Sequence, residues 1–209
     1  MADRLDTLPV ELLVRGRRAV VIGGDAECAA KVERLLVGGA VVHVFPEGTA
    51  PLDAIVARAR EGAIAIEERP FEDRDAVGAC VVFLSPAHEA LGARLAARAR
   101  VEGTLVCTLD RPEASTFINP AVARGAGLSV SISSGGAAPA LVKALRQELE
   151  RWLGDEALGR FVAELARARR QTPRTARGAR AKELLEGFRV DVKAMFPAWF
   201  AREVSSRDT

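Results

Sequence analysis

Residues 18–36 read RAVVIGGDAECAAKVERLL, and the predicted fold follows from this stretch. It opens with a short apolar run that favours a buried strand. Residues 26–37 then favour a helix, because Ala29, Val32 and Leu35 fall near one face. A strand, a glycine-rich turn and a helix, in this order, indicate the start of an α/β domain. The backbone N–H groups of such a turn can approach a pyrophosphate.

The glycine turn matches only part of the dinucleotide-binding pattern G-x-G-x-x-G. Gly23 holds the first position, and Asp25 stands where a phosphate usually needs a residue without a side chain. Repulsion between unit charges ~4 Å apart is about 1 kcal/mol in water and ~4 kcal/mol at an effective dielectric of 20. Asp25 can instead cap the following helix, with no dinucleotide bound. By itself, this turn names no cofactor.

Apolar strand-like runs alternate with Ala/Leu/Arg-rich helical runs on the C-terminal side of this stretch, which indicates a parallel sheet with crossover helices. We expect further strands at 41–45, 63–67, 80–84 and 105–108, and helices at 51–60 and 86–100. Residues 117–134, FINPAVARGAGLSVSISS, predict a strand, a turn and a second strand instead. From Pro139 the chain is helical, with a break at QTPRT and a further helix through KELLEGF.

The composition is that of an ordinary globular protein. The chain has 209 residues, 49% hydrophobic and 28% charged, with a net charge of +2, so no strong overall field would recruit nucleic acid or a membrane. The N-terminus has acids and arginines where a signal peptide needs an apolar run, and no segment reaches a membrane-spanning length. We therefore expect a cytoplasmic protein. Cys28, Cys80 and Cys107 lack metal-ligand spacing and are predicted to be reduced and buried.

A wider resemblance rests on three stretches in order: LPVELLVRGRRAVVIGG, KVERLLVGGAVVHVFPEG and LDRPEASTFINPAVARGAGLSVSISSGGAAPALVKALRQELE. Together they resemble the dehydrogenase/ferrochelatase module of siroheme synthase over about residues 8–154. The most specific residues are Asp110, Phe117, Ile118, Pro120, Ser133 to Gly136 and Pro139. The resemblance implies a Rossmann-type domain over 1–120, a strand-turn-strand and helix over 121–153 that serves dimerisation, and a helical C-terminal domain over 154–209.

The resemblance also implies an activity. Members of this family are homodimers that oxidise precorrin-2 to sirohydrochlorin with NAD, and bifunctional members also insert ferrous iron. The family's acid/base aspartate falls on Asp110, and a carboxylate suits a reaction that removes a proton alongside a hydride. A turn residue before Arg111 and Pro112 is the alternative for Asp110.

By the same resemblance, the cofactor-binding residues are Gly23, Gly24, Asp25, Ala26, Phe45, Pro46, Leu84, Ser85 and Cys107. Ser133, Ser134, Gly135 and Gly136 form a strand-to-helix turn whose N–H groups can bind substrate carboxylates, or whose serines cap the next helix. Asp25 and Cys107 depart from the family's usual glycine and asparagine. They motivate an alternative function, a relative that has lost NAD and acts as a tetrapyrrole-binding or chelatase-only protein.

Other polar and aromatic features have simpler interpretations. His43 is expected to pack in a strand and His88 to face solvent on a helix, since neither has metal-ligand spacing. Residues 167–182 hold seven basic residues and no acid, but no aromatic lies among them to stack on bases, so no nucleic acid is expected. They form a solvated helical face or a rim that attracts an acidic substrate. The aromatic residues Phe196, Trp199 and Phe200 are predicted to be core or dimer-contact anchors.

Overall fold

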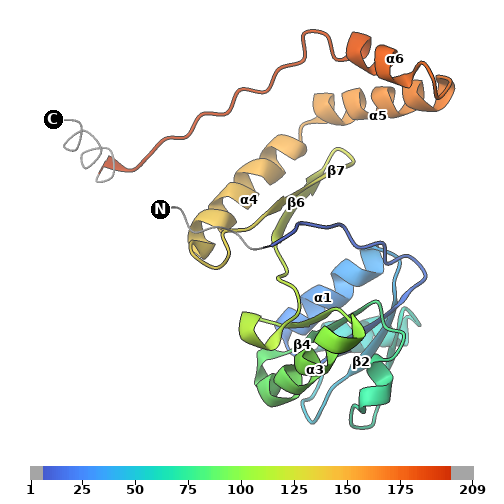
Figure 1. The fold of residues 1–209 in the computed structure, drawn as a ribbon, viewed down its shortest axis with the longest axis vertical. Helices are drawn as coiled ribbons and strands as arrows, with labels where there is room; N and C mark the ends of the chain where they lie inside the picture. Colours follow the sequence, from blue (N-terminus) through green and yellow to red (C-terminus); the bar gives the residue numbers. More distant parts are fainter. Residues whose placement is uncertain (1–6, 199–209) are drawn as a thin grey trace. The chain divides into compact units, whose positions relative to one another are not determined.

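The computed structural model describes residues 7–198, and the first part of the chain forms a five-stranded parallel sheet (Figure 1). The strands are β1 (Arg18–Ile22), β2 (Val41–Phe45), β3 (Ile64–Ile66), β4 (Val81–Leu84) and β5 (Val106–Thr108). Their order across the sheet is β3-β2-β1-β4-β5, and every pairing is parallel. The order reverses direction at β1, as in doubly wound dinucleotide-binding folds, so the predicted Rossmann-type class is confirmed.

Helices cover both faces of this sheet. Successive side chains of each strand point to opposite faces, so apolar residues of one strand enter two separate cores. Ala19 and Val21 of β1 join a core with residues of α1 (Ala26–Val37) and α2 (Asp53–Arg60). Val20 and Ile22 join the opposite core with residues of α3 (Glu89–Glu102). All four of these β1 side chains are fully buried, which explains why β1 reads as a continuous apolar run.

Three short 3-10 helices lie between the longer elements: η1 (Asp73–Ala76), η2 (Pro86–His88) and η3 (Pro112–Ala114). The helix expected at 86–100 is divided into η2 and α3. Ser85 caps η2 by accepting a hydrogen bond from Ala87 N–H at 3.2 Å, and α3 runs on to Gly103, whose φ of +76° ends it.

A β-hairpin follows the sheet, as expected. It consists of β6 (Ala121–Gly125) and β7 (Leu128–Ile132), joined by Ala126 and Gly127. Both joining residues have positive φ, +50° and +72°, as a two-residue type I′ turn requires.

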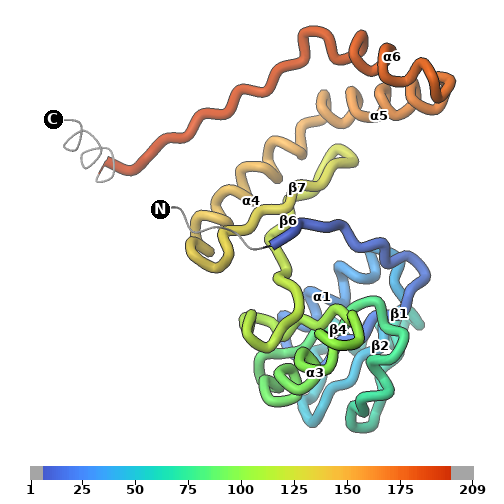
Figure 2. Tube along the Cα trace, viewed as in Figure 1, coloured from blue at the N-terminus to red at the C-terminus, as the bar shows by residue number. Residues whose placement is uncertain are grey.

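Three helices form most of the C-terminal part: α4 (Pro139–Leu153), α5 (Glu156–Gln171) and α6 (Arg177–Leu184). The break at QTPRT is confirmed, but the last helix begins at Arg177 and ends at Leu184, before the end of the KELLEGF stretch. From Leu185 the chain forms turns and then runs mostly extended (Figure 2).

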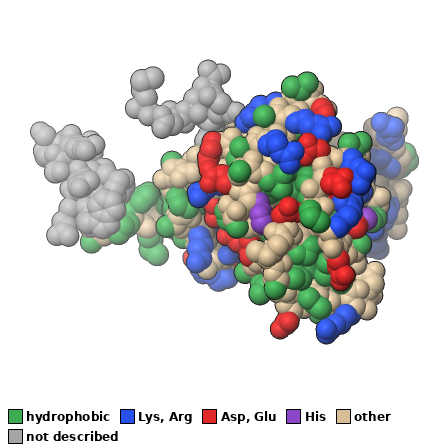
Figure 3. Space-filling view, turned by 90° about the horizontal axis from the view of Figure 1, so that it is seen from below, with side chains coloured by type: hydrophobic (Ala, Val, Ile, Leu, Met, Phe, Trp, Pro, Cys, Tyr) green, Lys and Arg blue, Asp and Glu red, His purple; other side chains and the backbone are tan. Residues whose placement is uncertain are grey.

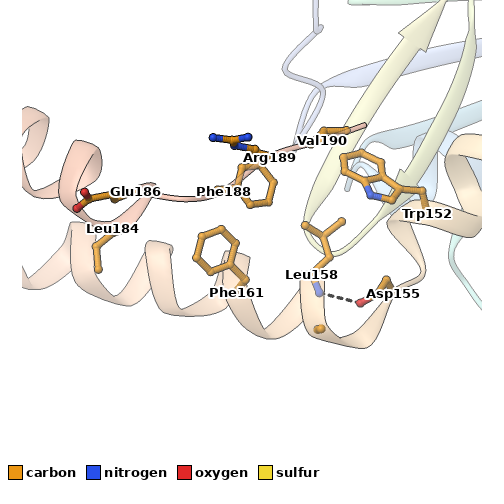
Figure 4. A pocket seen from close by; sticks show the side chains of 10 residues that line it. Trp152, Asp155, Leu158, Phe161, Leu184, Glu186, Phe188, Arg189 and Val190 are labelled. Atoms are coloured by element: carbon orange, nitrogen blue, oxygen red, sulfur yellow. Dashed lines mark hydrogen bonds between the residues drawn. The ribbon is translucent and has the colours of Figure 1, made fainter. Parts of the chain in front are cut away.

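The chain divides into two compact units. One comprises residues up to Ala121 together with Ser131–Lys143, and the other comprises Val122–Val130 and the residues from Ala144 onward. In the second unit, the rings of Phe161 and Phe188 stack at 5.3 Å beside an open cavity of about 410 Å³ (Figure 4). Within residues 7–198, no helix is long and apolar enough to cross a membrane.

Two of the predicted aromatic anchors lie outside the described residues. These are Trp199 and Phe200. Phe196 is described, and 64% of it is exposed, so it is not part of the core of this chain.

Candidate active site

The carboxyl ends of the parallel strands form the edge at which the predicted nucleotide-binding residues lie. Gly23 N–H donates to Phe45 O at 2.8 Å, which joins the end of β1 to the end of β2. Ser85 N–H donates to Ile22 O at 2.8 Å, which joins β4 to β1. Three further predicted residues lie at the same edge: Pro46 follows β2, Leu84 ends β4 and Cys107 lies on β5. Open parallel sheets bind their ligands outside this edge.

The two glycines of the turn are required by close packing within the protein. Gly23 has a φ of +121°, and a Cβ there would meet the Cβ of Ser85 at 2.6 Å. A Cβ on Gly24 would meet the Cα of Pro51 at 2.7 Å. Both contacts are shorter than real Cβ atoms tolerate, so the turn passes its neighbours as bare backbone.

Asp25 is the N-cap of α1. Its Oδ1 accepts a hydrogen bond from Cys28 N–H at 2.9 Å. Partial burial raises the pKa of Asp25, but hydrogen bonds from Ser85 and from the N–H groups of Cys28 and Glu27 outweigh it, and the pKa lies below its ordinary value. The carboxylate therefore stays charged and accepts from Cys28 N–H, one of the helix N–H groups that a phosphate could use.

Three N–H groups of the turn remain for a ligand. Among the hydrogen bonds of residues 7–198, the N–H groups of Gly24, Asp25 and Ala26 donate to no protein acceptor. They stand at the positive end of the α1 dipole, where anions are stabilised. The turn therefore fits a pyrophosphate through these N–H groups, although the negative charge of the Asp25 carboxylate opposes an anion at the same helix end.

Asp110 lies in a rigid turn after β5. Its φ of +57° is a left-handed conformation that aspartate tolerates better than most residues. Ser115 fixes the turn from behind: its Oγ accepts from Thr108 N–H at 3.0 Å and donates to Arg111 O at 2.8 Å. Thr108 Oγ1 donates to Ala114 O at 2.8 Å. The turn thus presents an exposed carboxylate on a buried, hydrogen-bonded base.

Three polar side chains lie near Asp110. Burial and then the charge of Asp110 raise the pKa of Glu27, on the first turn of α1. Lys31 lies one turn further along α1, with Nζ 5.6 Å from the centre of the Phe83 ring, and its charge interacts with those of Glu27 and Asp110. Burial raises the pKa of the Cys107 thiol, so Cys107 is neutral at pH 7 and unsuited to act as a nucleophile.

Lys31 is a site residue that was not predicted from the sequence. The signal was present, because Lys31 follows Glu27 by four residues, a spacing that brings two side chains to one face of a helix. Its neighbours Val32 and Leu35 are buried, so this part of α1 faces the protein rather than solvent. Sequence alone did not indicate that this face meets the end of β5.

The serine-glycine turn before α4 has the predicted strand-to-helix geometry. Ser133 Oγ accepts from Gly135 N–H at 3.2 Å, and Ser134 Oγ accepts from Ala138 N–H at 3.0 Å, so the serines cap the turn that leads into the helix. Gly135 and Gly136 have positive φ, +62° and +88°. No hydrogen bond within the described residues joins this turn to Asp110.

The remaining predicted features are mostly structural. His43 Nδ1 lies 2.9 Å from Glu67 Oε1, so it is a packed strand histidine with an acidic partner. The prediction that His88 faces solvent is wrong in part, because its Nε2 is buried and has no hydrogen-bond partner within residues 7–198. The three cysteines are free and buried, as predicted.

On the face shown in Figure 3, acidic and basic side chains are interspersed with hydrophobic and uncharged ones. The basic residues of 167–182 lie on α5, on α6 and between them, where Arg167 pairs with Glu164 and Arg180 with Glu183. Within residues 7–198, no group of three or more His, Cys, Asp or Glu side chains could hold a metal ion.

The sheet order, the glycine turn into α1 and the free N–H groups of that turn define a Rossmann-type dinucleotide-binding protein. Residues 10–121 match the family described as "Putative NAD(P)-binding", and the chain belongs to this family. Residues 127–151 match the family described as the central part of sirohaem biosynthesis proteins. The resemblance stated from the sequence is therefore confirmed.

Curated relatives agree with these family matches. The siroheme synthase of Gluconacetobacter diazotrophicus is 35% identical over 168 residues, which cover 78% of this chain and 36% of the relative. That of Pseudomonas entomophila is 35% identical over 167 residues, which cover 79% of this chain and 35% of the relative. The chain thus spans about a third of the length of these relatives. The solved structure of SirC, precorrin-2 dehydrogenase, shares the fold: its TM-score is 0.68 at 18% identity, covering 96% of this chain and 98% of that one.

Proposed function

We propose that this protein is an NAD-dependent precorrin-2 dehydrogenase that makes sirohydrochlorin in siroheme biosynthesis. The observation that carries the proposal is the carboxylate of Asp110, held on a rigid turn after β5 of the sheet whose β1–α1 turn fits a pyrophosphate. The siroheme synthases that align with this chain support the choice of substrate.

In the proposed reaction, the cofactor accepts a hydride from the substrate and the protein accepts a proton. NAD, when bound, supplies the acceptor for a hydride from the tetrapyrrole. The N–H groups of Gly24 and Ala26 would hold its pyrophosphate at the α1 dipole. Asp110 would accept the proton that leaves with the hydride, so that precorrin-2 and NAD⁺ give sirohydrochlorin, NADH and a proton. Ser133 to Gly136 would bind a substrate carboxylate through exposed backbone N–H groups.

The activity is tested by adding precorrin-2 and NAD to the purified protein. We expect the absorption spectrum of sirohydrochlorin to appear together with NADH absorbance. The proposal fails if neither product forms at saturating NAD.

Asp110→Asn tests the catalytic assignment. Asparagine tolerates a positive φ, so the turn survives while the proton acceptor is lost. Since general acid/base groups contribute roughly 10²–10⁴-fold, turnover should fall by that order with an unchanged melting temperature. Glu113→Gln, in the same turn, is the matched control and should keep full turnover. Near-normal activity of Asp110→Asn would remove Asp110 from the mechanism.

Binding of NAD separates this proposal from the tetrapyrrole-binding or chelatase-only alternative. The alternative is motivated by Asp25, which caps α1 by accepting from Cys28 N–H and stays charged. Calorimetric titration with NAD should give a micromolar dissociation constant. Binding of sirohydrochlorin without any binding of NAD would favour the alternative instead.

We extend the proposal to ferrous iron as a second substrate, since Asp110 could also accept the pyrrole protons that leave when a metal enters the ring. Iron-dependent conversion of the sirohydrochlorin spectrum to that of siroheme is the test. We further propose that the protein acts as a cytoplasmic homodimer through residues 121–153.

A further inference from the structure

Lys31 is unusual among the basic residues of this chain. The chain holds 30 Lys and Arg residues, of which only Lys31, Lys143, Lys182 and Lys193 are lysines. The other three are exposed, whereas Lys31 is half-buried. A lysine offers a compact charge on a flexible stem, which differs from the flat, branched group of arginine used nearly everywhere else here.

Lys31 also has no ion-pair partner. Among residues 7–198, arginines pair with carboxylates across the surface, but no carboxylate lies within 4.0 Å of Lys31 Nζ. One side of the ammonium is occupied by the Phe83 ring at 5.6 Å, and that ring packs edge-on against Phe117 at 5.7 Å. Burial lowers the pKa of Lys31, as expected for a desolvated ammonium without a close counter-charge.

A half-buried charge without a partner is costly for the folded protein. An apolar residue of similar length would cover Phe83 equally well without that cost. The Phe83 ring under the ammonium lies on β4 and pairs in the sheet with Cys107 of β5, three residues before Asp110. The charge of Lys31 interacts there with those of Glu27 and Asp110. This arrangement favours a ligand whose anionic group binds next to Asp110 and serves as the counter-charge of Lys31.

We propose that Lys31 is the anchor for a carboxylate of the tetrapyrrole substrate, which it holds beside Asp110. The inference rests on the proposed function. A carboxylate is favoured over a cofactor phosphate because Lys31 lies in the second turn of α1, beyond the N–H groups of Gly24 and Ala26, and contacts Phe83, the sheet neighbour of β5. Precorrin-2 and sirohydrochlorin both carry many carboxylates, so either can supply the anion.

Lys31→Met in the full chain is the primary test, because methionine keeps the apolar stem over Phe83 and removes only the charge. Fluorescence titration with sirohydrochlorin should show about tenfold weaker binding or more, as for a lost charged hydrogen bond. Calorimetric titration with NAD should be unchanged, and the melting temperature should be equal or higher. Lys31→Arg should keep most of the sirohydrochlorin affinity.

Lys182→Met is the matched control, since Lys182 is exposed on α6. It should bind sirohydrochlorin as the parent protein does. Unchanged sirohydrochlorin binding by Lys31→Met, or a loss confined to NAD, overturns the role of Lys31 while the proposed function stands. Failure of the parent protein to bind sirohydrochlorin and to oxidise precorrin-2 overturns both.

Discussion

At the scale of single residues, Asp25 has the most consequence for the cofactor. It occupies the helix end that dinucleotide-binding proteins leave open, and its hydrogen bonds with Cys28 and Ser85 keep it charged. The two roles of Asp25 have opposite effects on folding and on cofactor binding. The cap stabilises α1, whereas the charge opposes a pyrophosphate next to Gly24.

Asp25→Gly should therefore tighten NAD binding. Glycine is itself tolerated as an N-cap, so the cost to folding should be only a few tenths of a kcal/mol. Removal of one nearby charge should lower the dissociation constant about fivefold or more, measured by calorimetry. Asp155→Gly is the control, because Asp155 caps α5 in the same way, with Oδ1 3.0 Å from Leu158 N. Equal affinities of Asp25→Gly and the parent protein would show that Asp25 does not oppose the cofactor.

At the scale of secondary-structure elements, the position of the Asp110 turn depends on how closely α3 approaches β5. Gly92 of α3 is buried, and a Cβ there would meet Thr108 Oγ1 at 2.1 Å. Thr108 in turn holds the residues that follow Asp110. The glycine thus serves helix-to-strand packing rather than a turn.

Gly92→Ala should destabilise the protein by roughly 1–3 kcal/mol, because the methyl group would push α3 away from β5. Chemical denaturation measures this, and turnover should fall as the Asp110 turn shifts. Gly159→Ala is the control on α5: a Cβ there would meet nothing within 4 Å, so the variant should be neutral or more stable by up to about 1 kcal/mol. A stable Gly92→Ala variant would contradict the packing argument.

At the scale of the whole molecule, the proposed homodimer would bury apolar side chains that are exposed in the single chain. Within residues 121–153, Leu128 is 39% exposed, Leu145 is 44% exposed and Trp152 is 39% exposed. Exposed apolar groups clustered in one segment favour contact with another copy.

Leu145→Glu should convert the protein from dimer to monomer, because a carboxylate in an apolar interface would remain unpaired. Light scattering after size exclusion measures the mass. Val101→Glu is the control, since Val101 on α3 is 88% exposed and lies outside the proposed interface. A parent protein that is already monomeric, or a variant that is still dimeric, would contradict the proposal.

Much of this molecule follows from local sequence. The apolar runs predicted the strands, and the turn residues predicted the hairpin, because each depends on backbone preferences and side-chain burial within a few residues. Asp25 could be suspected as a cap for the same reason. The ends of individual elements were less predictable. The helix expected from residue 51 begins at Asp53 as α2, because Leu52 N–H donates to Gly24 O at 2.9 Å instead of entering the helix. This contact joins residues that are distant in the sequence.

The class of fold and the glycine turn could be predicted from the residues themselves, and Asp110 was predicted from the family resemblance. Which side chains surround Asp110 depended on the tertiary structure. Lys31 and Glu27 lie about eighty residues before it, and they come close to it because α1 covers the sheet face that β5 completes. Charges act through space, so the electrostatic surroundings of a carboxylate depend on folded distances that no local pattern contains.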